Sequence, residues 1–170
     1  MSNHDFNTLP SCGDFDFRIA RDGTWFYRGS PIGRKPLVRL FSTVLRREDD
    51  GSFWLVTPVE RGRITVDDAP FVAVEMRVTG VGRDQELAFR TNVDDWVTAD
   101  AAHPITIRHP RGDEPSPYVR VRGMLDALIA RPVFYDLVEL AETHERADGI
   151  ELGVWSAGTY FPLGQAEDAA

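Results

Sequence analysis

Residues 36–45 read Pro36-Leu37-Val38-Arg39-Leu40-Phe41-Ser42-Thr43-Val44-Leu45, and the architecture predicted here starts from this stretch. Its apolar residues fall at the i, i+3, i+4, i+7 and i+8 positions of one helical face, a spacing typical of an amphipathic helix. Proline suits the first helical position because its fixed φ is already helical and its missing N–H has no partner there. We therefore expect a helix from Pro36 to near Glu48.

A second stretch follows the same plan. Pro132 opens it, apolar residues continue to Ala141, and Gly149 closes it. Arg28-Gly29 precedes the first helix and Arg122-Gly123 precedes the second, each time in the order strand, Arg-Gly, connection, proline, helix. Self-similarity of this kind indicates an internal duplication. Chance similarity between two α+β segments is the alternative explanation.

Extended segments surround both helices. Phe15, Phe17 and Ile19 alternate with other residues at the period of a strand, and Asp22-Gly23 predicts a hairpin turn after them. The fold class is therefore α+β, with two similar β-rich halves that each carry one main helix. We place the N-terminal half at 15–80, the C-terminal half at 81–165, and flexible termini at 1–14 and 166–170.

The composition is that of a globular protein, with 42% hydrophobic and 27% charged residues. No apolar run reaches the roughly 18 residues of a membrane span, and the first ten residues lack the pattern of a secretory signal, so we expect a cytoplasmic protein. The net charge of −8 argues against nucleic acid and against an anionic membrane as partners. Ten basic residues face only five acidic ones between Arg18 and Arg63. Solvated side chains that screen one another explain this excess, and an anion-binding surface or mutual attraction of the halves are the alternatives.

The chain carries no clear motif for a cofactor or a metal. The segment from Gly29 to Lys35 has three residues between its glycines instead of the four of a phosphate loop, and Pro36 follows where a hydroxyl residue is needed. The four histidines and Cys12 lack the spacing of metal ligands. We expect no cofactor and no metal, and the sequence identifies no catalytic residues.

Arginines of both halves offer planar donor groups that suit carboxylate or phosphate. If the halves pack with pseudo-symmetry, Arg28 and Arg122 are equivalent. The leading hypothesis is a binding or regulatory module with a role in signalling, whose site between the halves takes an anionic small molecule or an acidic protein segment. The alternative role of the arginines is structural pairing with carboxylates. The candidate ligand-binding residues are Trp25, Tyr27, Arg28, Arg34, Glu60, Arg63, Asp67, Tyr118, Arg120 and Arg122.

Two other functions compete with this hypothesis. A small enzyme would use Glu60 or Asp67 as a base, with Arg63 or Arg120 steadying an anion, and it needs the carboxylate to face a concave pocket. A structural subunit would use the aromatic residues of the last strand as an oligomer interface, namely Trp155, Tyr160 and Phe161.

Several motifs agree in order with one bacterial family. They are Asp22-Gly23-Thr24-Trp25-Phe26-Tyr27, Arg28-Gly29-Ser30-Pro31-Ile32, Thr57-Pro58-Val59-Glu60, Val66-Asp67-Asp68-Ala69-Pro70-Phe71 and Pro117-Tyr118-Val119-Arg120-Val121-Arg122. With these motifs the chain resembles the DUF1285 family, whose function is unknown, from about Phe15 to Leu163. The resemblance implies a duplicated α+β core with a second half similar to pleckstrin-homology-like barrels. It implies no activity and no catalytic residues, so the motif positions serve the fold or a site.

Overall fold

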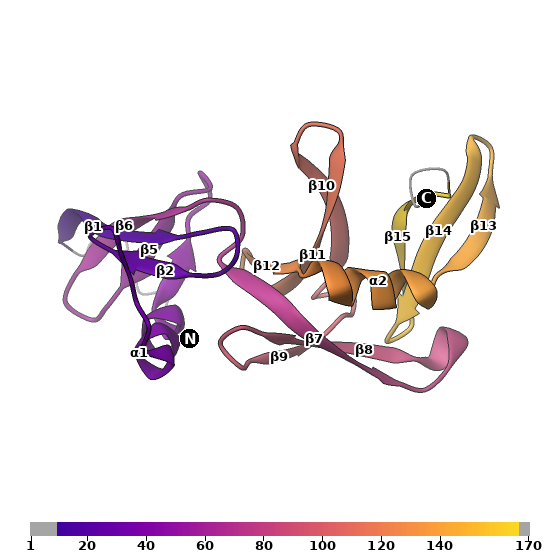
Figure 1. The fold of residues 1–170 in the computed structure, drawn as a ribbon, viewed down its shortest axis with the longest axis horizontal. Coiled ribbons are helices and arrows are strands. Elements are labelled where there is room, and N and C mark those ends of the chain that lie inside the picture. The colour runs from indigo at the N-terminus through magenta and orange to yellow at the C-terminus, as the bar shows by residue number, and fades with distance from the viewer. Residues whose placement is uncertain (1–9, 167–170) are drawn as a thin grey trace. The chain divides into compact units, whose positions relative to one another are not determined.

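The computed structural model describes residues 10–166, which form two compact units (Figure 1). Among these residues, unit 1 comprises 10–70 with 123–125, and unit 2 comprises 71–122 with 126–166. Strands make up 54% of the structure and two α-helices are described, so the prediction of a β-rich α+β protein is confirmed. The predicted boundary at 80/81 places residues 71–79 in the first half, whereas these residues pair with strands of unit 2.

Unit 1 is built on a six-stranded sheet, sheet A, in which a parallel pair, β1 and β6, lies at the centre. All other neighbours are antiparallel, and the strand order is β3-β2-β1-β6-β5-β4. The strands are β1 (Ser11–Ile19), β2 (Trp25–Tyr27), β3 (Ser30–Pro31), β4 (Leu45–Arg47), β5 (Phe53–Val56) and β6 (Arg61–Val66). Of the predicted flexible termini, residues 1–9 and 167–170 lie outside the described residues, and residues 11–14 belong to β1.

Tight turns set the register of the first three strands. The hairpin predicted at Asp22-Gly23 is confirmed, because β1 and β2 pair across it. A second hairpin follows at Arg28-Gly29, where both turn residues have positive φ, 50° and 79°. Such a pair of φ values is the signature of a type I′ turn, whose twist matches that of the flanking strands. Arg28 therefore occupies a turn position and Gly29 supplies the freedom that the turn needs.

The helix of unit 1, α1 (Lys35–Thr43), begins as expected with Pro36 in its first turn, but it ends five residues before Glu48. Near its end, the hydroxyl of Ser42 donates to the carbonyl of Arg39 and that of Thr43 donates to the carbonyl of Leu40. Side chains that bond the preceding turn in this way compete with helix continuation. Leu45, predicted on the helical stripe, instead lies buried in β4 opposite Leu55.

Unit 2 contains a second six-stranded sheet, sheet B, which curls into a half-barrel. Its order is β10-β11-β12-β7-β8-β9, with β12 and β7 parallel at the centre. The strands are β7 (Phe71–Thr79), β8 (Glu86–Thr91), β9 (Trp96–Thr98), β10 (Ile105–Arg111), β11 (Glu114–Arg122) and β12 (Leu125–Ile129), and a 3-10 turn, η2 (Gly82–Asp84), precedes β8.

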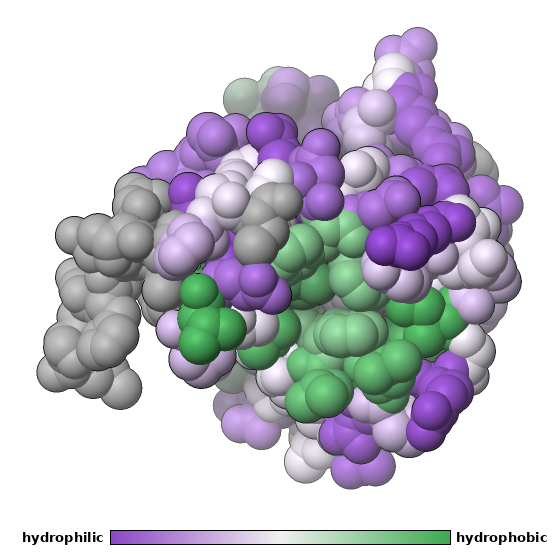
Figure 2. All heavy atoms as spheres, turned by 90° about the vertical axis from the view of Figure 1, so that its left-hand side faces the viewer, coloured by the Kyte–Doolittle hydropathy of each residue, from purple (hydrophilic) through white to green (hydrophobic). Residues whose placement is uncertain are grey.

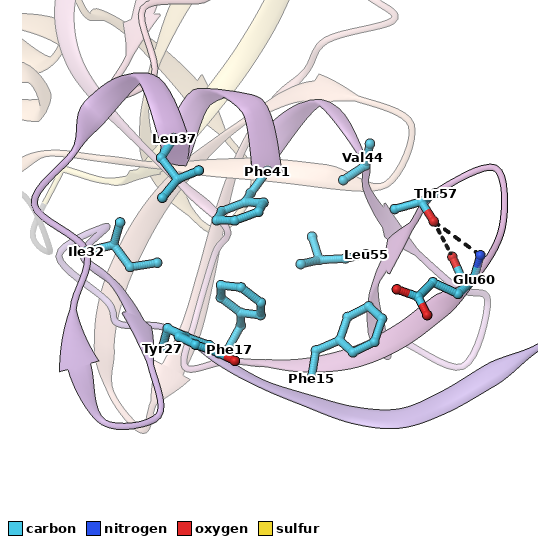
Figure 3. Close-up of a pocket in the computed structure, with 10 residues that line it drawn as sticks. All are labelled: Phe15, Phe17, Tyr27, Ile32, Leu37, Phe41, Val44, Leu55, Thr57 and Glu60. Carbon is cyan, nitrogen blue, oxygen red and sulfur yellow. Dashed lines mark hydrogen bonds between the residues drawn. The ribbon is translucent and has the colours of Figure 1, made fainter.

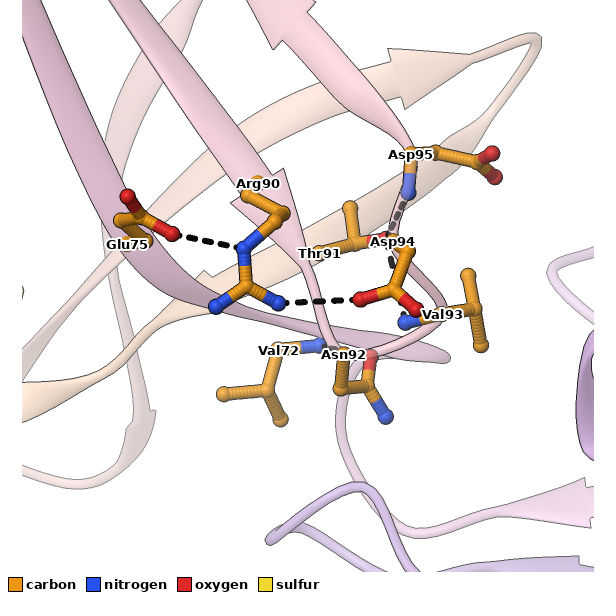
Figure 4. A network of polar contacts seen from close by, with 8 residues as sticks. All are labelled: Val72, Glu75, Arg90, Thr91, Asn92, Val93, Asp94 and Asp95. Carbon is orange, nitrogen blue, oxygen red and sulfur yellow. Dashed lines mark hydrogen bonds and ion pairs between the residues drawn. The ribbon is translucent and has the colours of Figure 1, made fainter. Parts of the chain in front are cut away.

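A polar network holds the β8–β9 turn of sheet B (Figure 4). Arg90 bridges Glu75 and Asp94, with nitrogen–oxygen distances of 2.7 and 3.0 Å, and these carboxylates raise the pKa of its guanidinium. The side-chain oxygen of Asn92 accepts the Val72 backbone N–H at 3.0 Å. The turn is therefore tied to β7 from two sides.

The second helix, α2 (Arg131–Glu139), leads from sheet B into a three-stranded sheet, sheet C. Sheet C consists of β13 (Glu142–Arg146), β14 (Gly149–Ser156) and β15 (Thr159–Gln165). Val133 and Leu137 are the buried residues of α2, so the predicted apolar face is present, although the helix ends before Leu140 and Ala141. Across residues 10–166, neither helix has the length and apolar character needed to cross a membrane.

The predicted repeat differs from the arrangement observed. Sheets A and B share one strand order. In each sheet the first three strands form a meander from the centre to one edge, and the last three strands form a meander from the other edge back to the centre. The helices do not correspond, because α1 connects β3 to β4 inside sheet A whereas α2 follows β12. Arg28 lies in a hairpin turn and Arg122 ends β11, so the predicted equivalence of these two arginines is not observed.

Candidate functional site

A pocket of about 510 Å³ lies in unit 1 between α1 and sheet A (Figure 3). Its floor comes from the central strands, its roof from the helix and the residue that follows it, and its two ends from the β3–α1 connection and the β5–β6 turn. Eight of the ten lining residues are apolar or aromatic, and the lining is Phe15, Phe17, Tyr27, Ile32, Leu37, Phe41, Val44, Leu55, Thr57 and Glu60.

The helix is attached to the sheet through aromatic contacts beside the pocket. The ring of Phe41 lies 5.0 Å from that of Phe17 in an edge geometry and stacks on Trp25 with ring centroids 6.2 Å apart. Trp25 is 1% exposed and belongs to the core of unit 1. Phe17 also contacts Tyr27 at 4.9 Å, so the wall of the pocket continues from the buried core to the surface.

The pocket is open to solvent. Six of its apolar lining residues are only half-buried, and Tyr27 is 41% exposed. Figure 2 shows hydrophobic side chains gathered on the corresponding side of the molecule, with hydrophilic side chains around them. A contiguous apolar area of this kind on a globular protein marks a binding site more often than an isolated exposed side chain does.

Glu60 is held at one end of the pocket by the β5–β6 turn. The Thr57 hydroxyl donates to the carbonyl of Glu60 at 3.0 Å and accepts the Glu60 backbone N–H at 3.2 Å, while the Thr57 N–H also donates to the Glu60 carbonyl. Pro58 and Val59 at the tip of the turn are exposed. The backbone of Glu60 is thereby fixed, and its carboxylate points into the pocket in Figure 3.

The two arginines that follow Glu60 on β6 have contacts outside the pocket. Arg61 lies over the ring of Trp54, 4.3 Å from its centroid, and pairs with Glu48 at 3.3 Å. Arg63 is exposed on β6 and lies opposite Trp54 on β5. Neither arginine is among the residues that line the pocket.

Of the residues predicted from the sequence, Tyr27 and Glu60 come together in this pocket, and Trp25 lies behind its wall. Arg28 lies over the ring of Tyr27, 5.1 Å from the centroid, and Arg34 is exposed at the start of α1. Asp67 lies outside the pocket and forms a salt bridge with Arg18. Its carboxylate accepts from Arg18 Nε at 3.1 Å and from Arg18 Nη2 at 2.6 Å.

The three remaining predicted residues belong to unit 2 and have partners there. Tyr118 is 1% exposed and carries Arg108 over its ring at 3.8 Å. Arg120 Nε donates to Asp126 at 2.5 Å, and Arg122 pairs with Asp95 at 3.7 Å. These contacts match the structural role that the sequence left open for the arginines. The anion site between the halves stays a prediction.

The structure bears differently on the enzyme alternative and on the structural-subunit alternative. Glu60 does face a concave pocket, as the enzyme alternative requires, whereas Asp67 does not. Phe161 of the predicted oligomer interface is only 4% exposed, and Trp155 and Tyr160 are half-buried, which leaves that surface little apolar area. Between residues 10 and 166 no cluster of three or more His, Cys, Asp or Glu side chains could hold a metal ion.

The sequence did not identify most of the pocket-lining residues as site residues. Phe15, Phe17, Leu37, Phe41 and Val44 carry the apolar periodicity that predicted a strand and a helix, and that periodicity assigned them to the core. Ile32 belongs to one of the family motifs, which did not distinguish a fold position from a site position, and Leu55 had no distinguishing signal.

Comparison with known proteins relates both units to one family. Residues 7–69 match the model "Domain of unknown function (DUF1285), N-terminal domain" and residues 70–163 match "Protein of unknown function (DUF1285), C-terminal domain". A crystal structure of a DUF1285 family protein from Silicibacter pomeroyi DSS-3 is similar with a TM-score of 0.87 and 52% identity, covering 95% of this chain and 86% of that one. A DUF1285 protein from Shewanella baltica OS155 has a TM-score of 0.56 and 25% identity, covering 73% of this chain and 91% of that one. No curated protein matches.

Proposed function

Because the chain belongs to the DUF1285 family, whose description carries no activity, we propose its function from the pocket: unit 1 is a binding module that holds the apolar part of a ligand between α1 and sheet A. The observation that carries the proposal is the solvent-open pocket of about 510 Å³ with eight apolar or aromatic lining residues. Ligand pockets typically measure about 300–1,000 Å³ and combine an apolar lining with a few polar groups.

The energetics favour occupancy by an apolar group. The lining side chains keep apolar area in contact with water, and each Å² removed from water contributes about 25 cal/mol. A ligand that buries about 200 Å² of apolar surface there gains about 5 kcal/mol before the entropy of association is subtracted. The pocket is therefore suited to weak binding of an alkyl or aryl group, with a dissociation constant of about 0.2 mM at the tightest.

The test uses 1-octanol as a probe and a variant that fills the pocket. Val44 lines the pocket directly after α1, so Val44→Phe should occupy part of the volume. Val81→Phe makes the same change at a position that is 86% exposed and serves as the matched control. We expect 1-octanol to raise the unfolding temperature of the wild type and of Val81→Phe, because a ligand that binds only the folded state stabilises it.

For Val44→Phe we expect at least a tenfold loss of octanol affinity with the circular dichroism spectrum unchanged. Octanol that leaves the wild-type unfolding temperature unchanged, or that stabilises Val44→Phe as much as the wild type, would refute the proposal.

The finer features of the architecture are also proposals. We infer that the two six-stranded sheets are duplicated units, and the support is their shared strand order. The half-barrel of sheet B supports a likeness of unit 2 to pleckstrin-homology-like barrels. A role in signalling would follow if the ligand of the pocket controlled the binding of a second protein.

A further inference from the structure

We propose that the ligand of the unit 1 pocket is an anionic amphiphile, an alkyl or aryl group that carries a carboxylate or phosphate, with its charged head beside Arg28. This inference rests on the proposed binding function and adds the chemical class of the ligand. It retains the anionic ligand expected from the arginines and assigns it to unit 1. Its basis is the contact between Arg28 and Tyr27, a residue that lines the pocket.

Arg28 brings a positive charge to the rim of the pocket. Its guanidinium carbon lies 5.1 Å from the centroid of the Tyr27 ring, and Arg28 itself is not one of the lining residues. Both Arg28 and Tyr27 are exposed. A head group at the Tyr27 end of the pocket therefore meets the guanidinium at the boundary with solvent, while the tail lies among the apolar lining residues.

The Arg28 guanidinium has no carboxylate partner among residues 10–166. Its backbone N–H donates to the carbonyl of Asp16, but the two side chains form no salt bridge. Arg18 and Arg108 also lie over aromatic rings, and each of them is already paired with an aspartate. A guanidinium is a planar group of N–H donors that matches two oxygens of a carboxylate or phosphate. Arg28 is therefore available to the head group of a ligand.

The two ends of the pocket differ in charge. Tyr27 and Ile32 lie at one end in Figure 3, and Glu60 lies at the other. Between the lining residues Tyr27 and Leu37 the chain contains three basic residues and no acidic residue. One of them, Arg34, is exposed and forms no ion pair within the described part of the chain. An anionic head is attracted to the Tyr27 end and repelled from the Glu60 end, which sets the direction of an amphiphile in the pocket.

The local charge favours a free amphiphile over a lipid in a bilayer. Screening limits the interaction between exposed charges to about 8–10 Å at physiological ionic strength, so a small anion beside Tyr27 interacts mainly with Arg28. The net charge of −8 of the whole chain opposes the close approach of the protein to an anionic bilayer. The ligand is therefore a small molecule that enters the pocket from solution.

The experiment compares three probes with the same eight-carbon chain, used below the concentrations at which they aggregate. Octanoate is the anion, 1-octanol the neutral probe and octyltrimethylammonium the cation, and affinities are measured by calorimetric titration at pH 7. We expect octanoate to bind about fivefold more tightly than octanol, the upper range for an exposed ion pair, and the cation to bind more weakly than octanol. Added salt should reduce the advantage of octanoate, since screening weakens the charge interaction.

Two variants locate the preference for the anion. Arg28→Gln removes the charge, so the ratio of octanoate affinity to octanol affinity should fall to about one, with the circular dichroism spectrum and the unfolding temperature unchanged. Arg77→Gln is the matched control, because Arg77 is an exposed arginine that lies over the ring of Trp96 on sheet B. This control should retain the wild-type ratio.

The pocket-filling variant Val44→Phe places the tail of the anion. It should weaken the binding of octanoate and of octanol alike, because the tails of both probes occupy the same pocket. Octanoate that binds Val44→Phe as tightly as the wild type lies outside the pocket, and this result would overturn the inference.

The remaining outcomes separate this inference from the proposed function. A wild-type ratio of one or less, or a ratio that Arg28→Gln does not lower, overturns the anionic class and leaves the apolar pocket in place. Co-sedimentation of the wild type with phosphatidylglycerol vesicles, without binding of octanoate, assigns Arg28 to a membrane surface and overturns the free amphiphile. Absence of binding by both octanol and octanoate overturns the binding function itself, and this inference with it.

Discussion

The ring of Phe15 lies over Gly62 and occupies the space where any other residue at position 62 would place its Cβ atom. The two residues belong to the central parallel strands, β1 and β6. Phe15 lines the pocket, and its ring packs against the backbone of β6 at Gly62. Glycine at position 62 thus determines where the Phe15 side of the pocket stands.

Replacing Gly62 by alanine should displace this ring. We expect Gly62→Ala to lower the free energy of unfolding by about 1–3 kcal/mol, as overpacking of a buried site does, and to weaken binding of 1-octanol. Gly33→Ala is the matched control, because a methyl group there meets no atom within 4 Å. Urea titration of both variants provides the measurement, and equal stabilities would mean that the ring moves aside without strain.

The pocket shows which features of unit 1 the sequence pattern could predict and which it could not. The alternation of Phe15 and Phe17 and the helical spacing of Leu37, Phe41 and Val44 correctly identified the faces that α1 and β1 turn to each other. Periodicity reports which face is apolar, but it does not report how far apart the two elements stand. A filled core and an open pocket therefore have the same sequence pattern.

The arginines show a second limit. Their donor chemistry was predictable from residue type, but their partners depend on which strands pair and in which register. Asp126, which accepts from Arg120 and from Arg108, could be found only once β10, β11 and β12 were known to be neighbours. Likewise, the Thr57 hydroxyl that fixes Glu60 acts through a turn whose geometry the motif alone did not reveal.

The Asp126 carboxylate should be important for the stability of unit 2. Its side chain is 7% exposed and accepts from Arg120 at 2.5 Å and from Arg108 at 3.1 Å. In Asp126→Asn the amide has one acceptor oxygen and no charge, so one guanidinium loses its acceptor, and we expect a loss of about 2–3 kcal/mol in the free energy of unfolding. Asp148→Asn, at an exposed residue between β13 and β14, is the control for the change in charge. A matching denaturation midpoint for the two variants would argue against a structural role of Asp126.

Ser156 connects sheet C to sheet B through a fully buried hydroxyl. It accepts the Leu87 N–H at 2.9 Å and donates to the Ala99 carbonyl at 2.7 Å. Ser156→Ala leaves both backbone groups without this partner, so the free energy of unfolding should fall by about 2 kcal/mol. Amide hydrogen exchange at Leu87 should accelerate by a corresponding factor, whereas the exposed Ser30→Ala should change neither quantity. Exchange at Leu87 that stays at the wild-type rate in Ser156→Ala would show that another group satisfies this N–H.

The β1–β2 turn should contribute to acid sensitivity through Asp22. The Thr24 backbone N–H donates to its carboxylate at 2.9 Å, and this hydrogen bond, followed by one from the Thr24 side chain, lowers the pKa of Asp22 below its ordinary value of 3.8. A lowered pKa means that the unfolded chain binds the proton more readily than the folded protein does. The stabilising contribution is therefore complete above pH 3.8 and is lost as the pH falls through the lower, folded-state pKa.

Asp22→Asn keeps an acceptor oxygen for the turn but cannot titrate. We expect its free energy of unfolding to fall less steeply than that of the wild type between pH 5 and pH 2, with the two curves converging at the acid end because protonated Asp22 also lacks the charge. Asp136→Asn, on the exposed side of α2, makes the same charge change without touching a turn and should retain the wild-type slope. Urea titrations at closely spaced pH values measure the slopes. Parallel curves for Asp22→Asn and the wild type would show that the hydrogen bond from Thr24 does not favour the ionised carboxylate in solution.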